Sequence, residues 1–290
     1  MKIRIFQKGF HYGQDGRGNR LVLHLQGCNL RCPWCSNPEG LEPEGVLLTD
    51  KAWLSECCCP HGAVTKEGLD RNRCLSCRTR DCVRTMRQKG IRLSYREYET
   101  EEILRECERS KPMFFDGGGV TLTGGEVSVQ LDAVKELLQG LKARSIHTAI
   151  ETNGLHPRLP ELVPLVDQWI MDIKHYDASV HQSWCGAGNE AAAKVLEHVS
   201  AHHPDVTVRV PLIPGFNDRE QDAEGFAAYF LEHIRGGGTR IEFLTYHEFG
   251  KTKWEQCGLT YFLPSRKIAP ETVQTFEKIM KENGLLCVRT

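Results

Sequence analysis

The chain has 290 residues, of which 40% are hydrophobic and 26% are charged, and its formal net charge is −1. This balance gives no support for a nucleic-acid or membrane-surface partner, and no apolar run approaches the about 20 residues of a membrane span. Residues 1–10 lack the apolar run of a signal peptide, so we expect a cytoplasmic protein.

Apolar stretches rich in β-branched residues alternate with stretches of helical period along most of the chain. The predicted strands are 20–27, 120–125, 147–154, 168–174, 206–215 and 240–250, the last expected to end the sheet. The first predicted helix begins at 100. The others span about 130–143, 159–166, 189–202, 217–234 and 270–284. Thr100 is the expected N-cap of the first helix, and Pro270 and Gly284 the start and stop of the last.

This alternation gives about six β/α units, which predict an α/β fold with a parallel sheet and right-handed crossovers. Six units are too few for a complete eight-fold barrel. An open or partial barrel fits the pattern, and a doubly wound sheet would fit it too.

Residues 41–99 interrupt the alternation. They contain six cysteines and show no convincing strand or helix period. We interpret them as a module inserted in the first β-to-α connection, which leaves 1–40 and 100–290 as the main domain.

Cysteines are unusually frequent, and nine of the 13 lie between residues 28 and 82. In a reducing cytoplasm, such clustering indicates metal or redox chemistry rather than disulfides. The other four are expected to be mostly plain buried thiols. They are Cys107, Cys185, Cys257 and Cys287.

The stretch GCNLRCPWCSNP (27–38) places Cys28, Cys32 and Cys35 directly after the first predicted strand, in the spacing C-x3-C-x2-C. A structural zinc site closes its shell with four ligands, whereas three protein ligands leave a coordination position open for chemistry. Zinc with a fourth ligand from elsewhere stays an alternative. Thiolate sets of this kind also suit an iron–sulfur cluster in which one iron is free.

Polar residues stand at the ends of the other predicted strands, where parallel α/β folds gather their sites. They are Gly124, Gly125 and Glu126; Glu151, Thr152 and Asn153; Asp172 and Lys174; Arg209; and His247. Singly, each has an ordinary structural interpretation, because a glycine pair is usually a turn and an Asp-x-Lys pair usually a salt bridge. Together they predict one site on one rim of the sheet.

The three-cysteine spacing with Trp34 before its last cysteine, followed by GGE on the next strand, resembles the radical SAM superfamily. More closely, the chain resembles the glycyl radical enzyme activating enzymes, the family that includes pyruvate formate-lyase activating enzyme. The stretches DGRGNRLVLHLQGCNLRCPWCSNP, GGGVTLTGGE, ETNG, DIKH, RVPLIPGFND and YHEFG match that family in order, over nearly the whole chain. The resemblance implies a partial (β/α)6 radical SAM barrel with a small, cysteine-rich, ferredoxin-like insert.

The resemblance also implies a cofactor site. Cys28, Cys32 and Cys35 would hold a 4Fe–4S cluster whose open iron binds the amino and carboxylate groups of S-adenosylmethionine. GGE would meet the methionine amino group, and residues near the ends of later strands would hold the carboxylate and the ribose side. The implied cofactor-binding residues are Trp34, Ser36, Gly124, Gly125, Glu126, Glu151, Asp172, Ile173, Lys174, Arg209 and His247.

A monovalent cation is a further implied ligand. Glu151, Thr152 and Asp172, with the Met171 carbonyl, match positions where such enzymes can hold one. Glu151 is a departure here, because the pyruvate formate-lyase relative has a shorter aspartate at this position.

The implied activity is an oxidoreductase reaction on another protein under anaerobic conditions. The reduced cluster would cleave S-adenosylmethionine to methionine and a 5′-deoxyadenosyl radical, which would remove a hydrogen from a glycine Cα of a partner glycyl radical enzyme. Flavodoxin or ferredoxin would donate the electron. Two alternatives stay open: a radical SAM enzyme acting on another peptide or a small molecule, and a non-catalytic iron–sulfur electron carrier.

Many relatives carry two ferredoxin-like runs in the insert, C-x2-C-x2-C-x3-C-P, in which the fourth cysteine of one run ligates the other cluster. Here one crossed set is complete, and it consists of Cys59, Cys74, Cys77 and Cys82. The other set lacks its first three cysteines and has Met86 in its fourth place. The count predicts one insert cluster, with a tetrahedral zinc site on the same sulfurs as the alternative.

The choice of Cys59 as the fourth insert ligand is a best guess. Cys57 and Cys58 precede it directly and are assigned to no other metal site, so either could take its place as the ligand.

Overall fold

The computed structural model describes residues 1–54, 59, 61–65, 68–75, 77, 79–84 and 89–289. All six predicted strands are confirmed, each with slightly different ends. They are β2 (Asn19–Leu25), β6 (Gly119–Gly124), β7 (Thr148–Thr152), β8 (Gln168–Asp172), β9 (Val206–Leu212) and β10 (Thr239–Thr245). They pair in parallel in chain order, which is the arrangement that the β/α alternation predicts.

Three further strands extend this sheet and were missed by the sequence patterns. β1 (Lys2–Tyr12) pairs antiparallel with β2, and β5 (Arg96–Glu99) pairs antiparallel with β1. β11 (Leu286–Val288) pairs in parallel with β10, so β10 does not end the sheet. The order is β11-β10-β9-β8-β7-β6-β2-β1-β5, which makes the sheet mostly rather than wholly parallel. The edge strands β5 and β11 are short, and β1 is half exposed, so all three lack a clear apolar pattern.

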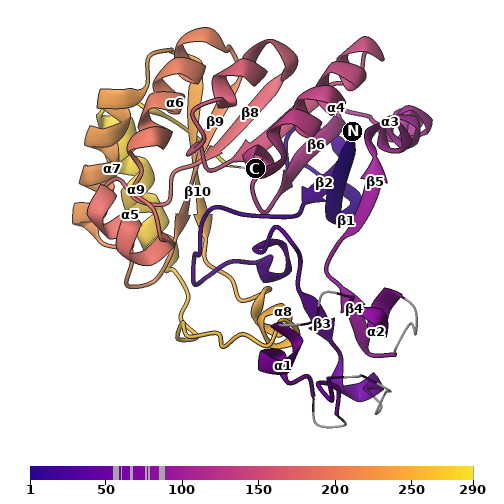
Figure 1. Cartoon of the computed structure of the whole chain (residues 1–290). Helices are drawn as coiled ribbons and strands as arrows, with labels where there is room; N and C mark the ends of the chain where they lie inside the picture. The colour runs from indigo at the N-terminus through magenta and orange to yellow at the C-terminus, as the bar shows by residue number, and fades with distance from the viewer. Residues whose placement is uncertain are drawn as a thin grey trace.

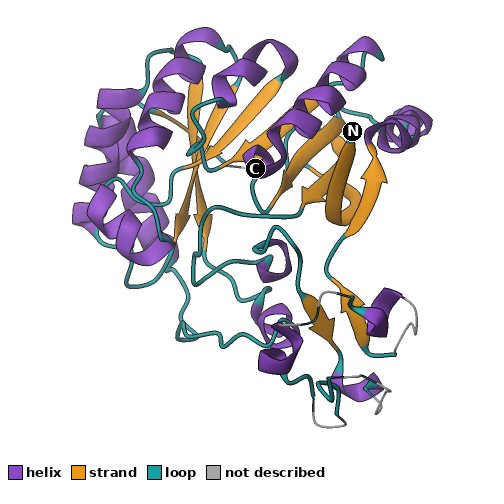
Figure 2. Cartoon of the chain, in the orientation of Figure 1, coloured by secondary structure: helices purple, strands orange, loops and turns teal. Residues whose placement is uncertain are grey.

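Helices cover one side of this curved sheet, as Figures 1 and 2 show. The longer ones are α3 (Thr100–Arg109), α4 (Leu131–Ala143), α6 (Glu190–His202), α7 (Glu220–His233) and α9 (Pro270–Glu282). The predicted helix 159–166 is a 3-10 helix, η5 (Leu159–Leu165), because prolines at 160 and 164 remove two backbone donors. Two shorter helices, α5 (Ala178–Cys185) and α8 (Lys251–Gln256), were missed.

Of the three predicted helix ends, the N-cap at Thr100 is wrong, whereas the start at Pro270 and the stop at Gly284 are confirmed. The N-cap of α3 is Glu99, whose backbone N–H donates to the Glu102 carboxylate at 2.8 Å. Thr100 is instead the first helical residue, and its hydroxyl accepts from the Met1 ammonium at 2.9 Å. Gly284 adopts φ +74° just beyond α9, the left-handed conformation in which glycine stops a helix.

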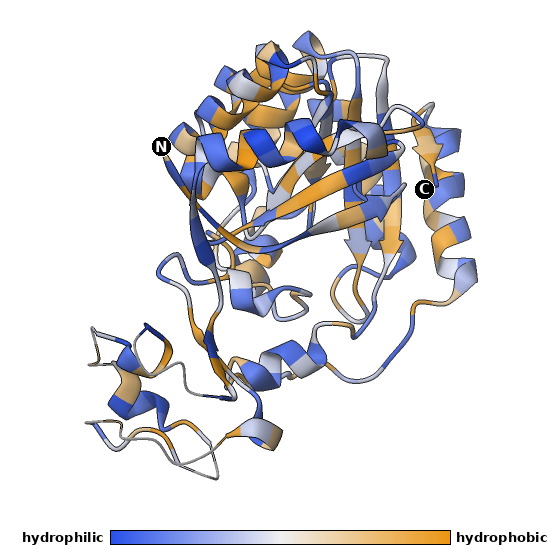
Figure 3. Cartoon of the chain, turned by 90° about the vertical axis from the view of Figure 1, so that its right-hand side faces the viewer, coloured by the Kyte–Doolittle hydropathy of each residue, from blue (hydrophilic) through white to orange (hydrophobic). Residues whose placement is uncertain are grey.

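The strands bury apolar side chains towards the helices and keep polar ones on the opposite face. In β2, Leu21, Leu23 and Leu25 belong to the main core, while Arg20 points the other way and donates to the Thr121 hydroxyl at 2.6 Å. Figure 3 shows the strands as largely hydrophobic bands behind helices whose outer faces are hydrophilic. The polar face of the sheet is therefore free to build a site.

The insert lies below the sheet in Figure 1. Its described part contains β3 (Leu47–Thr49) paired antiparallel with β4 (Ile91–Leu93), and the short helices α1 (Arg71–Leu75) and α2 (Asp81–Arg84). The sequence showed no strand or helix period in 41–99, because elements of three to five residues are too short to show one. β5 also lies within 41–99, yet it pairs in the main sheet.

Candidate active site

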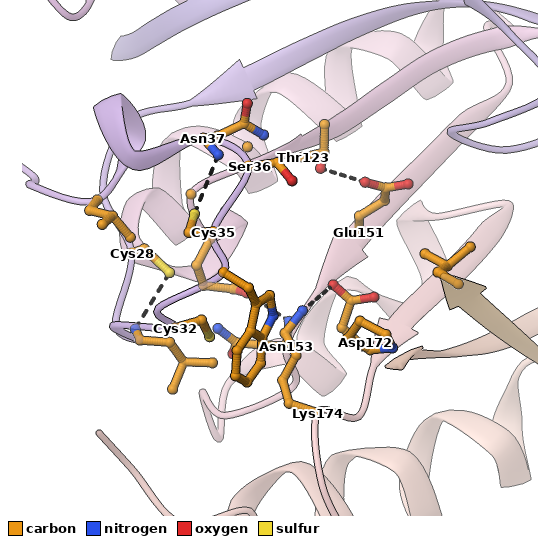
Figure 4. A pocket seen from close by; sticks show the side chains of 18 of the residues that line it. Cys28, Cys32, Cys35, Ser36, Asn37, Thr123, Glu151, Asn153, Asp172 and Lys174 are labelled. Carbon is orange, nitrogen blue, oxygen red and sulfur yellow. Dashed lines mark hydrogen bonds and ion pairs between the residues drawn. The ribbon is translucent and has the colours of Figure 1, made fainter. Parts of the chain in front are cut away.

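An open cavity of about 240 Å³ lies at the carboxyl ends of the parallel strands. Most of the predicted site residues line it together, and Figure 4 shows how they face it from the cysteine loop and the strand ends. These are Cys28, Cys32, Trp34, Cys35, Ser36, Gly124, Gly125, Glu126, Glu151, Thr152, Asn153, Asp172, Lys174 and His247. The rule that parallel sheets gather polar groups at one rim therefore brings together residues that are up to 219 positions apart, from Cys28 to His247.

The three-cysteine loop is held in place by backbone hydrogen bonds. The N–H groups of Leu30 and Asn37 donate to the sulfurs of Cys28 and Cys35, each at 3.4 Å. The indole N–H of Trp254 donates to the Cys35 carbonyl at 2.8 Å. The loop thus presents its sulfurs from a fixed backbone.

Burial raises the pKa of the Cys28 and Cys35 thiols to about 12. The pKa of Cys32 is also raised, by a hydrogen bond with the Cys185 thiol and by burial. Cys185 had been expected to be a plain buried thiol, and it lies against the cysteine loop, where its carbonyl accepts from the Arg31 N–H at 2.8 Å. Buried thiols of this kind become thiolates where a metal cation compensates their charge.

The two glycines of GGE allow the cysteine loop to approach β6. A Cβ atom at Gly124 would collide with the Leu25 nitrogen, and one at Gly125 with the Gly27 carbonyl oxygen. Gly124 also has φ +116°, a conformation that other residues rarely adopt. The glycine pair is therefore required for the loop to sit where it does.

The Glu126 carboxylate ties the ends of β6 and β7 together. It accepts hydrogen bonds from the Ser128 N–H at 3.0 Å, the Thr152 hydroxyl at 2.7 Å and the Asn153 N–H at 2.8 Å. The side-chain amide of Asn153 then donates to the Asn29 side chain in the cysteine loop at 2.7 Å. This chain of contacts fixes the loop relative to two strands.

Asp172 and Lys174 form an ion pair with 2.7 Å between Oδ2 and Nζ. Burial opposes the charge on Lys174, yet the Asp172 carboxylate holds the pKa of that ammonium above its ordinary value. The structural and functional interpretations of Asp-x-Lys therefore coincide, since the pair exists and also lines the cavity. On the far wall, burial lowers the pKa of His247, which favours a neutral imidazole.

Two predicted cofactor-binding residues do not line the cavity. Ile173 is buried in the main core. Arg209 lies behind the wall, where it pairs with Glu151 and Glu242 at 2.6 Å each. Burial opposes its charge, but these two carboxylates hold the pKa of Arg209 above its ordinary value. The Glu151 carboxylate also accepts from the Thr123 hydroxyl at 2.6 Å.

Several lining residues were missed by the sequence analysis, among them Leu30, Asn37, Leu41, Thr123, Pro211, Ile213, Leu244, Thr245 and Tyr246. Most are common residue types without a chemical signature. Only their position beside a predicted strand end could have indicated them.

The four predicted insert ligands share a second cavity, of about 380 Å³. Cys59, Cys74, Cys77 and Cys82 line it, and Cys257 from the end of α8 lines it too. Cys57, Cys58 and Met86 lie outside the described residues. In the described ranges, no group of three or more His, Cys, Asp or Glu side chains stands as a preformed metal site. Each cysteine set fits an iron–sulfur cluster because its soft sulfur donors line a single cavity, one cavity for each set.

Within the described residues, no helix has the length and apolarity that crossing a membrane requires.

Comparisons of this chain with known proteins identify the family to which it belongs. Residues 22–227 match the Radical SAM superfamily. The chain is 37% identical to the (2S)-3-sulfopropanediol sulfolyase activating enzyme of Bilophila wadsworthia (strain 3_1_6), over 94% of this chain and 92% of that one. It is 32% identical to the isethionate sulfite-lyase activating enzyme of Desulfovibrio desulfuricans (strain ATCC 27774 / DSM 6949 / MB), over 84% and 83%.

A solved radical SAM methyltransferase from Sphaerobacter thermophilus shares the fold. Its TM-score is 0.57 at 14% identity, over 96% of this chain and 67% of that one. The family match covers more than half of the chain, and the curated relatives align along almost all of it. The chain therefore belongs to the radical SAM superfamily, within its group of glycyl radical enzyme activating enzymes.

Proposed function

We propose that this protein activates a partner glycyl radical enzyme by reductive cleavage of S-adenosylmethionine and abstraction of a hydrogen from a glycine Cα. The observation that carries the proposal is one cavity lined by three loop cysteines, GGE, the Asp172–Lys174 pair and His247. The full-length likeness to activating enzymes supports it.

S-adenosylmethionine and a 4Fe–4S cluster are the cofactors of this superfamily. In this chain, Cys28, Cys32 and Cys35 would hold the cluster, since three thiols on one fixed loop leave one iron without a protein ligand. When bound and reduced, the cluster supplies the electron that cleaves S-adenosylmethionine into methionine and the radical that takes the glycine hydrogen.

The protein's own residues orient the substrate. The half-buried Lys174 ammonium, charged and held by Asp172, would attract the methionine carboxylate. Because the carboxylate of Glu126 is engaged by β7, GGE would meet the methionine amino group through its backbone. Neutral His247 would contact the ribose side, and Trp34 with Ser36 would close the loop side of the pocket against water.

Ile173 and Arg209 do not line the cavity. Ile173 packs in the core, and Arg209 reaches the cavity only through Glu151. We propose that Arg209 positions Glu151. A monovalent cation would compete for the Glu151 carboxylate, which is already paired with Arg209 and Thr123.

For the insert, we propose one 4Fe–4S cluster held by Cys59, Cys74, Cys77 and Cys82, which relays electrons from a donor such as flavodoxin or ferredoxin. All of its ligands are cysteines, so it has no open iron for substrate. Zinc on the same sulfurs is the competing proposal. We divide the chain accordingly into 1–40 with 100–290 and the insert 41–99, with β5 as the strand that returns to the sheet. A cytoplasmic location suits this oxygen-sensitive chemistry.

The test is an anaerobic panel of partners, read by EPR for a glycyl radical doublet and by chromatography for 5′-deoxyadenosine. The relatives name the candidates: (2S)-3-sulfopropanediol sulfolyase first, then isethionate sulfite-lyase, indoleacetate decarboxylase and 4-hydroxyphenylacetate decarboxylase. We expect a doublet on at least one of them. 5′-Deoxyadenosine without a doublet on any would favour an enzyme acting on another substrate, and neither product would favour an electron carrier.

A further inference from the structure

The two most exposed large apolar side chains in the described part of the chain are phenylalanines beside the active-site cavity. Phe249 is 82% exposed and Phe262 is 76% exposed. Both belong to the segment between β10 and α9, which contains α8, as Figure 1 shows. Large apolar side chains left in water at one place are typical of interaction sites.

The first of these, Phe249, is fixed to the rim of the cavity. Its ring stacks on the ring of His247 with 4.3 Å between centroids, and His247 lines the cavity. The next residue, Gly250, packs against the cysteine loop so closely that a Cβ there would lie 2.7 Å from the Cys35 carbonyl oxygen. A Lys253 hydrogen bond to the Asn37 side chain, at 2.8 Å, holds the same segment.

The second, Phe262, is held near the cavity by its neighbours Tyr261 and Leu263. The hydroxyl of Tyr261 lies 2.7 Å from that of Tyr246, which lines the cavity. Leu263 packs on the small buried cluster that contains Cys32 and Trp34. The two phenylalanines therefore project from segments anchored both to each other and to the cysteine loop.

A further contact closes this arrangement. The hydroxyl of Ser265 donates to the Glu248 carboxylate at 3.2 Å, which joins the residue before Phe249 to the segment that follows Phe262. Anchored aromatic rings lose little conformational entropy when they bind, and they dominate the energy of many protein–protein contacts.

We propose that Phe249 and Phe262, which we name the phenylalanine rim, dock the glycine-bearing segment of the partner enzyme through apolar side chains on either side of the glycine. The proposal rests on the function proposed above, because that function requires a polypeptide glycine to reach this cavity. The rim is continuous with the cavity wall through His247 and Tyr246. A segment that docks on the rim is thereby directed to the cofactor site.

The test compares Phe249→Ser/Phe262→Ser with the wild type and with Leu231→Ser, a control on α7 that is 53% exposed. The full-length protein is reconstituted anaerobically, and (2S)-3-sulfopropanediol sulfolyase and the other panel members serve as probes. Glycyl radical formation is measured by EPR against partner concentration, and 5′-deoxyadenosine is measured without partner. Phe249→Tyr/Phe262→Tyr tests rescue by an aromatic ring.

We expect the double serine variant to need about tenfold more partner for half-maximal radical formation. Its maximal rate and its partner-free 5′-deoxyadenosine formation should stay near wild type, and Leu231→Ser and the tyrosine variant should behave as wild type. An unchanged partner dependence overturns the docking role alone. Equal loss of partner-free cleavage would show a structural role and overturn it too.

Two further outcomes separate the possibilities that remain. If the wild type is a dimer in solution and the serine variant is a monomer, the rim is a contact between two copies and the proposal is wrong. If the wild type cleaves S-adenosylmethionine but radicalises no panel member, the proposed function fails, and the docking role fails with it.

Discussion

The two cysteine sets of this protein sit on very different supports. The loop that carries Cys28, Cys32 and Cys35 is bound into the sheet: the Cys28 N–H donates to the Leu41 carbonyl at 2.9 Å, and the Glu126 N–H to the Gly27 carbonyl at 2.7 Å. Of the insert cysteines, Cys74 and Cys82 lie on helices of five and four residues, and Cys59 and Cys77 lie in loops, around a small core.

This difference indicates what determines the geometry of each cysteine set. The loop is positioned by the large sheet and its core rather than by the metal alone, so an open coordination position there can be used for chemistry. A module as small as the insert has little core of its own, and in such modules metal binding supplies part of the folding free energy. The following predictions test this difference between the two cysteine sets.

The largest expected effect is that of Cys32→Ala, which should abolish 5′-deoxyadenosine formation because two thiolates do not hold a cluster with a free iron. Cys287→Ala in β11 is the matched control and should leave formation unchanged. Product formation by the iron-reconstituted Cys32→Ala protein would remove the basis for the cysteine loop as the active centre.

Replacing Cys74, Cys77 and Cys82 together by alanine should cost the protein about four irons and leave the loop cluster in place. The insert should also become more sensitive to proteolysis, because it loses the metal that organises it, while the sheet should stay resistant. Iron analysis and limited proteolysis measure the two effects. Loss of both clusters would show that the sites do not depend on separate supports.

Lys174→Ala and His247→Ala should each weaken S-adenosylmethionine binding by about 1–3 kcal/mol, since each removes one polar or charged contact. Iron content should stay at the wild-type level because neither residue supports the cysteine loop. Equilibrium binding and iron analysis on the same samples check this. Iron loss in both variants would assign them to structure instead.

The smallest effect is expected for Arg71→Ala. The Arg71 guanidinium donates to the Leu47 carbonyl within the insert and to the Gln256 carbonyl at the end of α8, both at 2.9 Å. Its loss should speed amide hydrogen exchange near residues 46–49 and 256–258, whereas Arg105→Ala, exposed on α3, should not. Equal exchange in all three proteins would mean that Arg71 does not attach the insert.

The sequence predicts those parts of the fold and site whose physical cause is local. The β/α alternation predicts the six parallel strands, and the rule on strand ends brings Lys174 and His247 to the cavity with the cysteine loop. A glycine pair at the end of β6 is understood once the structure shows Gly125 pressed against the Gly27 carbonyl.

Features that depend on long-range packing escaped prediction. β1 and the edge strand β5 pair antiparallel with partners that no local sequence pattern indicates. Arg209 was placed near a strand end, yet it is the middle residue of β9 and lies behind the cavity wall, paired with Glu151 and Glu242. α8 gave no signal, although its Trp254 contacts the cysteine loop and its carboxyl end contacts the insert.

The most direct test of the central claim, that two cysteine sets hold two centres with different tasks, is one EPR and iron measurement on the anaerobically reconstituted wild type. We predict about eight irons, and two reduced-cluster signals of which S-adenosylmethionine changes only one. Cys32→Ala should lose the responsive signal and the triple insert variant the other. About twelve irons, zinc in the insert, or a response to S-adenosylmethionine in both signals would contradict the account.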